Sequence, residues 1–277
     1  MSDGGVLIFT YDGSYDGLLS TVFDAFVLKK LPDNVVSFDE EEPALLPVHE
    51  VRTSRAHAER VEYGIKDKLG MTAYKMVRRG FLYGEEGKEM AILRFLWLGF
   101  HSEPGVANKI ALPEVAPLFK MATAVTNEAV QLRGFVRFID QKGALVSIIH
   151  PKHYVLPLLR SFFAARLPRE QFLIFDETHG AALIHTEKRD AIVPLESLEQ
   201  PETNEDRFYR DLWKTYYRHI AIAPRYNPTC RRTHMPKRFW ADLPEMEDES
   251  LPSYPDPALP DFSSRQKSCF VFDSVVK

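Results

Sequence analysis

The sequence predicts a mixed α/β fold in which helices pack on a central sheet of short strands. Short apolar runs bounded by turn residues alternate with longer stretches whose apolar residues recur at helical spacing. Apolar residues make up 45% of the 277 residues, which is ordinary for a globular chain and sufficient for a core. We expect a single domain over residues 1–243 and an acidic, proline-rich tail over 244–277. The pattern leaves the order of the strands open.

A strand, a tight turn and a helix open the chain. The apolar run at 6–10 is typical of a buried strand, and the glycines at 13 and 17 mark the turn. The following helix has apolar residues at helical spacing from Leu18 to Val27. Anions can bind where a strand leads into a helix N-terminus, although no dinucleotide or P-loop glycine pattern is present and a structural corner is the favoured interpretation. The candidate residues of this turn are Asp12, Gly13, Ser14 and Asp16, of which Ser14 or Asp16 can also cap the helix.

The middle of the chain is predicted to be largely helical. An acidic loop at 38–43 precedes a second strand at 48–53, and Ser54 can cap a helix that runs to Leu69. Three more helices are expected over 71–82, 85–101 and 113–132. The second of these is so apolar that we expect it to be a central core helix.

A hairpin and further short strands follow. Alternation at 133–138 predicts a strand, Gly143 a turn, and 144–150 the returning strand. A helix over 154–166 has Pro157 in its first turn. Strands are then expected at 172–176, 181–185 and 191–193, with Gly180 as the turn between the first two.

Residues 207–240, here called the basic segment, carry an unusual concentration of positive charge. They hold nine of the 35 Lys and Arg residues and one acid, Asp211, in a chain of net charge −4. The first four cations fall within one narrow arc of a helix that breaks near Pro224, and the others follow in an irregular run. Cations interleaved with aromatic rings suit a nucleic acid, because phosphates take the charge and rings stack on bases. The candidate binding residues are Arg207, Arg210, Lys214, Arg218, Arg225, Asn227, Arg231, Arg232, His234, Lys237 and Arg238.

A plainer interpretation of the basic segment is a solvated basic helix face. In that case Trp213, Tyr216 and Tyr217 belong to the core, and Trp240 also packs there. The acidic tail follows the basic segment directly, so a further hypothesis is that the tail folds back and screens it. The apolar stretch 269–276 would then dock as a strand.

Metals, cofactors and membranes are not indicated. Cys230 and Cys269 are the only cysteines, which is too few for a disulfide framework or an iron–sulfur cluster. Cys230 and His234 have a metal-compatible spacing, but a structural zinc site normally needs four ligands. The chain has no apolar run of 18 residues and no signal-peptide pattern at its start. We therefore expect a cytoplasmic protein with no metal, no cofactor and no membrane contact.

Several motifs resemble a bacterial family known as probable DNA metabolism proteins. YDGSYDGLL at 11–19 and VFDA at 22–25 resemble the N-terminal signature of that family. LWKTYY at 212–217, RYNP at 225–228 and MPKRFW at 235–240 resemble its C-terminal signature. GFVRF at 134–138 and YVLPLL at 154–159 also fit, so that the resemblance covers about residues 5–243.

The resemblance implies a role in DNA repair or DNA metabolism. Members of the family are paired in genomes with a radical SAM protein assigned to DNA repair, and some have an added uracil-DNA-glycosylase-like domain. The expected partners are therefore DNA and a radical SAM protein, which would hold any iron–sulfur cluster. The family supplies no catalytic residues. The expected function is an accessory protein that binds nucleic acid through the basic segment.

Two alternatives stay open at this point. In the first, the chain is an adaptor whose basic face docks on an acidic partner protein. In the second, it is an enzyme that processes nucleic acid with Asp12 and the basic segment. The sequence contains no Gly-x-Ser-x-Gly motif and no cluster of carboxylates, so nothing in it supports a hydrolase. His150-Pro151 resembles a fragment of a glycosylase motif without its other parts, so we interpret His150 as a strand-end residue.

Overall fold

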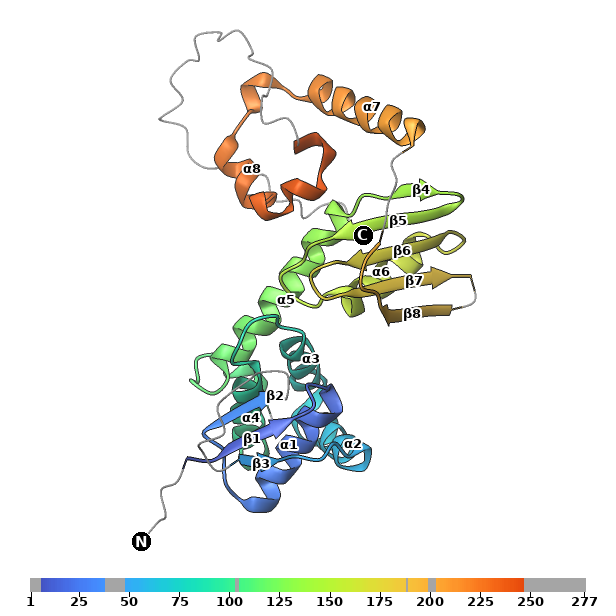
Figure 1. Cartoon of the computed structure of the whole chain (residues 1–277). Helices are drawn as coiled ribbons and strands as arrows, with labels where there is room; N and C mark the ends of the chain where they lie inside the picture. The colour runs from blue at the N-terminus through green and yellow to red at the C-terminus, as the bar shows by residue number, and fades with distance from the viewer. Residues whose placement is uncertain (1–5, 38–47, 103–104, 188, 199–202, 247–277) are drawn as a thin grey trace, which may run out of the picture. The chain divides into compact units, whose positions relative to one another are not determined.

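The computed structural model describes residues 6–37, 48–102, 105–187, 189–198 and 203–246 (Figure 1). Contacts between Cα atoms divide the chain into a first unit, 1–130 with 151–159, and a second unit, 131–150 with 160–277. The mixed α/β class is confirmed, but the strands of the described residues form two sheets instead of one central sheet. A single domain over 1–243 stays a prediction, because a division by contacts does not report whether the units unfold together.

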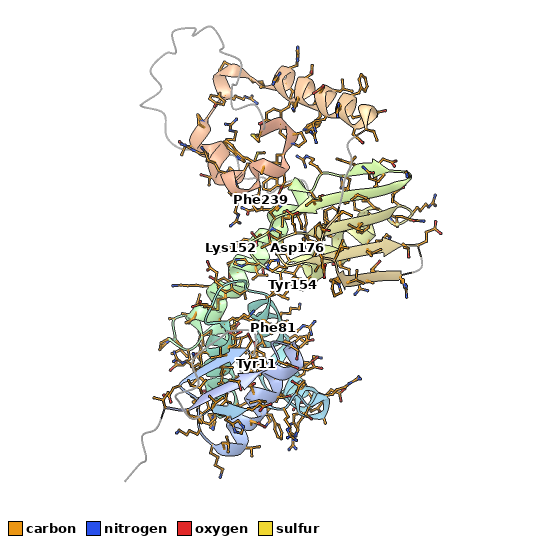
Figure 2. All side chains as sticks on the ribbon, viewed as in Figure 1. Tyr11, Phe81, Lys152, Tyr154, Asp176 and Phe239 are labelled. Atoms are coloured by element: carbon orange, nitrogen blue, oxygen red, sulfur yellow. The ribbon has the colours of Figure 1, made fainter. Side chains whose placement is uncertain are left out.

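The first unit has a parallel sheet in the order β2-β1-β3. The predicted strands are present as β1 (Ile8–Tyr11) and β3 (Val48–Glu50), whereas β2 (Asn34–Ser37) was missed because only two of its four residues are apolar. In the central strand Phe9 and Tyr11 are buried, and the Tyr11 hydroxyl donates to Glu89 Oε1 over 3.0 Å (Figure 2). Parallel neighbours need a crossover, which α1 (Tyr15–Leu28) provides between β1 and β2.

Helices make up the rest of the first unit. Ser14 caps α1 by accepting from Gly17 N, and Ser54 caps the next helix by accepting from His57 N. The helix expected from Ser54 to Leu69 is α2 followed by a π-helical turn. The fully buried Ile92, Leu93 and Phe95 confirm the central core helix. The elements are α2 (Arg55–Gly64), the π turn (Ile65–Leu69), α3 (Gly70–Phe81), α4 (Lys88–His101), a 3-10 turn (Val106–Asn108) and α5 (Ala116–Phe135), which continues into the second unit.

The strand expected at 133–138 is wrong, because α5 continues to Phe135 and Val136 N still donates to Leu132 O. The hairpin itself is confirmed a few residues later. Its strands are β4 (Ile139–Gln141) and β5 (Ala144–Ile149), and Lys142 and Gly143 turn between them with φ of 56° and 88°.

The sheet of the second unit has the order β4-β5-β6-β7-β8. Its other strands are β6 (Gln171–Asp176), β7 (Ala181–Thr186) and β8 (Arg189–Pro194), close to their predicted positions. β5 and β6 are parallel, joined through α6 (Leu156–Arg166), and the remaining pairs are antiparallel. Because Ile149 pairs with Asp176, the carboxyl ends of β5 and β6 meet at one edge of the sheet.

The basic segment forms a long helix and several short turns. The expected basic helix is α7 (Asn204–Ile220), and a 3-10 turn (Ala223–Arg225) follows it. The irregular run expected beyond Pro224 contains a further helix, α8 (Pro228–His234), which starts with proline at its first position. Two 3-10 segments, Lys237–Asp242 and Pro244–Met246, end the described chain.

Some expectations concern other parts of the chain. Residues 244–246, assigned to the tail from sequence, form a 3-10 turn in which Met246 is buried. Three expectations concern residues outside the described ranges. They are the acidic loop at 38–43, the screening by the tail and the docking of 269–276. Among the described helices the longest is α5 with 20 residues, and none combines the length and apolarity needed to cross a membrane.

Candidate nucleic-acid interface

A capping box fixes the start of α7. Thr203 Oγ1 accepts a hydrogen bond of 3.1 Å from Asp206 N, and Asp206 Oδ2 accepts one of 2.9 Å from Thr203 N. Two backbone N–H groups at the helix terminus are thereby satisfied. The basic segment begins at Arg207, four residues after Thr203, so this cap fixes the start of the helix that carries its first four cations.

The four cations of α7 share one side of the helix, but they differ in exposure. At about 100° per residue, Arg207, Arg210, Lys214 and Arg218 fall within about 80° of arc. Arg207 and Arg218 are exposed, whereas Arg210 and Lys214 are half-buried. Arg207 and Arg218 are therefore the cations of α7 that a large ligand can reach most easily.

Several aromatic side chains of α7 are exposed, including two for which the sequence left a core position open. Phe208, Tyr209, Trp213 and Tyr216 expose between 39% and 63% of their surface. The core interpretation is therefore wrong for Trp213 and Tyr216, while Tyr217 is half-buried. An amphipathic pattern indicates that one face is apolar, but it does not show whether that face is covered.

Two cations in the rest of the basic segment lie over one aromatic ring. The Arg231 guanidinium lies 4.9 Å from the centroid of the Trp240 ring, and Lys237 Nζ lies 5.3 Å from it. Trp240 Nε1 donates to Met235 O over 2.9 Å, so the half-buried Trp240 is anchored to the backbone of the segment. Arg225, Arg232, His234, Lys237 and Arg238 are exposed.

Asn227, expected to bind a ligand, has a structural role. Its Oδ1 accepts from Cys230 N over 2.9 Å and caps α8. Arg238, another predicted binding residue, donates through Nη2 to Gln131 Oε1 over 3.2 Å. The basic segment therefore uses some of its polar groups to cap its own helix and to bind α5.

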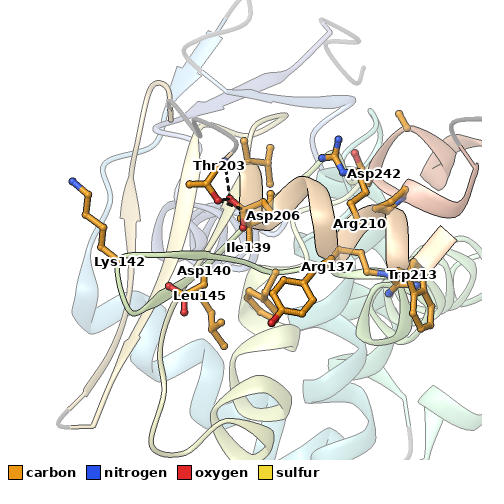
Figure 3. A pocket seen from close by; sticks show the side chains of 15 residues that line it. Arg137, Ile139, Asp140, Lys142, Leu145, Thr203, Asp206, Arg210, Trp213 and Asp242 are labelled. Atoms are coloured by element: carbon orange, nitrogen blue, oxygen red, sulfur yellow. Dashed lines mark hydrogen bonds between the residues drawn. The ribbon is translucent and has the colours of Figure 1, made fainter. Parts of the chain in front are cut away.

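A pocket of about 950 Å³ lies in the second unit beside α7. Arg137, Arg210, Trp213 and Asp242 lie toward one end of it, and Lys142 lies toward the other (Figure 3). Its lining combines three cations, three carboxylates and three aromatic rings, which suits a polar ligand with a flat ring. These residues are Arg137, Lys142, Arg210, Asp140, Asp206, Asp242, Phe138, Tyr209 and Trp213.

His150 connects the sheet edge to the C-terminal segment, a contact that sequence reasoning missed. Its Nδ1 lies 2.7 Å from Asp242 Oδ1, and its Nε2 lies 2.7 Å from Glu177 Oε2. Burial lowers the pKa of His150, but the hydrogen bonds to the two carboxylates outweigh burial, so its pKa is raised above the usual range. In the next turn the fully buried Asp176 (Figure 2) accepts from His179 N over 3.1 Å and lies 2.7 Å from its Nδ1. The His-Pro fragment was the only signal in the sequence for this cluster.

The turn at Asp12 lies in the first unit, and its polar groups bind one another. Asp12 Oδ1 accepts from Ser14 N over 3.0 Å and from Ser14 Oγ over 2.6 Å, and Oδ2 accepts from Thr53 Oγ1 over 2.7 Å. Desolvation raises the pKa of Asp12, but these hydrogen bonds outweigh it and the pKa is lowered. Gly13 has φ of 73°, and Asp16 lies in the first turn of α1. This arrangement suits a structural corner better than a catalytic base.

Comparison with known proteins gives a family and weak likenesses in structure. Residues 86–245 match the model of a family described as a domain of unknown function, DUF4130. No curated protein matches the chain. A pGpG-specific phosphodiesterase, PggH from Vibrio cholerae, is similar in structure with a TM-score of 0.29 and 9% sequence identity, over 74% of this chain and 87% of that one. A likeness at this level carries no argument about function.

Proposed function

We propose that this chain, which belongs to the DUF4130 family of unknown function, binds single-stranded nucleic acid along α7 and α8. The observation that supports this most directly is that α7 exposes both aromatic rings and cations, on different faces of the same helix. Single strands offer both phosphates and unstacked bases, and proteins that bind them combine basic surfaces with stacking rings. A duplex hides its base faces, so exposed rings favour a single strand.

The geometry of α7 fits this use. Its 17 residues extend over about 25 Å, enough for several nucleotides. Arg207 and Arg218 are exposed within about 20° of each other, and the exposed Phe208 and Tyr216 lie about 100° and 160° around the helix from the nearer arginine in the sequence. In the proposed complex the arginines bind phosphates and the rings stack on bases. Arg225 and Arg232 continue the basic surface beyond the helix.

The biological setting follows from the resemblance to the DNA metabolism family. In that setting the chain is an accessory protein of DNA repair, and it holds a DNA strand for a radical SAM partner. The two cysteines agree with this division of work, because an iron–sulfur cluster needs more thiolates than this chain has. This chain then supplies binding and positioning, and the partner supplies the reaction.

One observation favours an adaptor as a second candidate function. Leu212, Ile220 and Ile222 are more than half exposed, and aliphatic side chains cannot stack on bases as rings do. An exposed apolar face of this kind is typical of protein–protein contact. An adaptor would bind its partner protein tightly and DNA hardly at all.

A salt series with a fluorescent single-stranded oligonucleotide tests the proposal. Anisotropy should give an affinity that falls linearly in log salt. Arg207→Ala with Arg218→Ala should reduce that slope by about 1.4, at about 0.7 for each phosphate that the variant no longer neutralises. Tyr216→Ala should weaken binding by about 1–3 kcal/mol and leave the slope unchanged.

The matched control is Arg189→Ala, which removes an exposed cation from β8 in the same unit. It should change neither the affinity nor the slope. Circular dichroism should show that every variant is folded. The proposal fails if the folded wild-type chain does not bind at low salt, or if the double arginine variant binds with an unchanged slope.

A further inference from the structure

An apolar stripe follows the exposed side of α7. Phe208, Leu212, Tyr216 and Ile220 are spaced four residues apart, and each exposes more than half of its surface. With about 40° between successive members, the stripe winds slowly along the helix and stays continuous. A contiguous exposed apolar surface of this kind is typical of an interaction site.

The described chain ends beside this helix. Glu245 accepts a hydrogen bond from Trp213 Nε1, and Met246 is buried in the 3-10 turn that packs against α7. The segment that continues from residue 247 therefore starts at α7. Fifteen extended residues span about 50 Å, twice the length of a 17-residue helix, so this segment can reach every part of the stripe.

The composition of the continuing segment complements the basic segment. Residues 247–261 contain five acids and no Lys or Arg, whereas the basic segment contains nine cations and one acid. Further along, CFVFDSVV at 269–276 has six apolar residues out of eight. One stretch thus matches the charge of α7, and the other matches its apolar stripe.

We propose that residues 247–277 cover the exposed side of α7 and compete with its ligand. The acidic stretch lies against the cations, and the apolar stretch lies on Phe208, Leu212, Tyr216 and Ile220. The competition with nucleic acid rests on the proposed function, whereas the contact with α7 does not. The segment is the favoured occupant because it is tethered next to the stripe.

Tethering makes even a weak contact effective. A short linker gives an effective concentration of about 1 mM, so a contact with a Kd of about 0.1 mM holds about nine chains in ten closed. Only about a tenth of the molecules then present α7 to a ligand. The apparent affinity for nucleic acid is therefore about tenfold weaker than that of the open chain.

A fluorescent probe tests the contact without any nucleic acid. A bimane label on Cys269, in a Cys230→Ser background, should be quenched by the rings of α7 that it contacts. Leu212→Glu with Tyr216→Glu should relieve the quenching. The control Val130→Glu, which alters an exposed apolar residue of the first unit, should leave it unchanged. Absence of quenching overturns the proposed contact. The same holds if the quenching is equally strong in the double variant and in the Val130→Glu control. Quenching that rises with protein concentration indicates a second copy as the occupant and overturns it as well.

Nucleic-acid binding then separates the two proposals. A chain that ends at Met246 keeps every described residue and should bind the labelled oligonucleotide about tenfold more tightly than the full chain. If the probe is quenched and neither chain binds, the contact stands and the proposed function fails. If both chains bind equally and the probe is not quenched, the proposed function stands and the covering segment is refuted.

Discussion

The indole Nε1–H of Trp213 donates a hydrogen bond of 3.0 Å to Glu245, whose side chain is only 2% exposed. The other oxygen of the same carboxylate accepts from Arg137 Nη2 over 2.8 Å. Arg137 lies just before β4, so a single buried carboxylate joins α7 to the hairpin of the second unit. The orientation of the exposed side of α7 therefore depends on Glu245.

Replacing Glu245 should loosen this connection. Glu245→Ala leaves the Arg137 guanidinium and the Trp213 indole without their acceptor, and we expect a loss of about 2 kcal/mol in the free energy of unfolding. Urea denaturation followed by tryptophan fluorescence measures this loss. Glu187→Ala removes an exposed glutamate from the same unit and should change stability by less than about 0.5 kcal/mol. Equal effects of the two variants would contradict the role of Glu245.

His150 should make the stability of the second unit depend on pH. Its pKa is raised in the folded state, because hydrogen bonds to Glu177 and Asp242 favour the imidazolium and outweigh burial. The stabilisation is fully present below the unfolded-state pKa of about 6.5, and it is lost as pH rises through the higher folded-state pKa. The free energy of unfolding should therefore fall as pH rises above about 6.5 in the wild type.

His150→Gln removes the titrating group and should flatten this part of the pH profile. His234→Gln replaces an exposed histidine of the same unit and should leave the profile as in the wild type. Chemical denaturation at a series of pH values gives both profiles. A decline that persists unchanged in His150→Gln would show that another group is responsible.

Asp12 should behave as a structural residue. Its carboxylate accepts from Ser14 and Thr53, and its lowered pKa means that this contribution is present above the unfolded-state value of about 3.9 and lost as pH falls through the folded-state pKa. Asp12→Asn should cost about 1 kcal/mol of stability at neutral pH and weaken the acid dependence. Asp67→Asn, at an exposed position of the first unit, is the control. A catalytic role would require loss of an activity with unchanged stability.

Local signals predicted much of the secondary structure. The cap at Ser14 and the turn at Gly143 were predictable because only a few residue types are favoured at a helix N-cap and at a left-handed turn position. The strand β2 was missed because two apolar residues give too short a pattern. The end of α5 was misplaced because a short alternation of apolar and polar residues is compatible with either structure.

The candidate site was less predictable than the fold. The charge of the basic segment is a property of the sequence, but the exposure of Trp213 depends on what packs against it. His150 and Asp242 are 92 residues apart, so only the tertiary fold brings them together. Two parallel strands place His150 and Glu177 at the same edge, and the strand order that does so could not be derived from the sequence.

Gly84, between α3 and α4, should tolerate no side chain, because the loop after β5 packs against it. A Cβ on Gly84 would lie 2.1 Å from the carbonyl oxygen of Lys152, a backbone atom. The buried Glu128 holds this loop by accepting from Lys152 N over 3.1 Å and from His153 N over 2.8 Å, so the carbonyl cannot move away without breaking these bonds.

We therefore expect Gly84→Ala to lower the free energy of unfolding by about 1–3 kcal/mol, as overpacking does. Gly134→Ala is the matched control, because its Cβ meets nothing within 4 Å and the residue lies inside α5. That substitution should raise stability by about 0.5–1 kcal/mol, since alanine restricts the unfolded chain and favours a helix. Urea denaturation of both variants gives the comparison. The two substitutions add the same methyl group. Opposite signs for their changes in the free energy of unfolding therefore come from the space around each glycine and from its backbone conformation. A neutral Gly84→Ala would mean that the loop lies farther from Gly84 in solution.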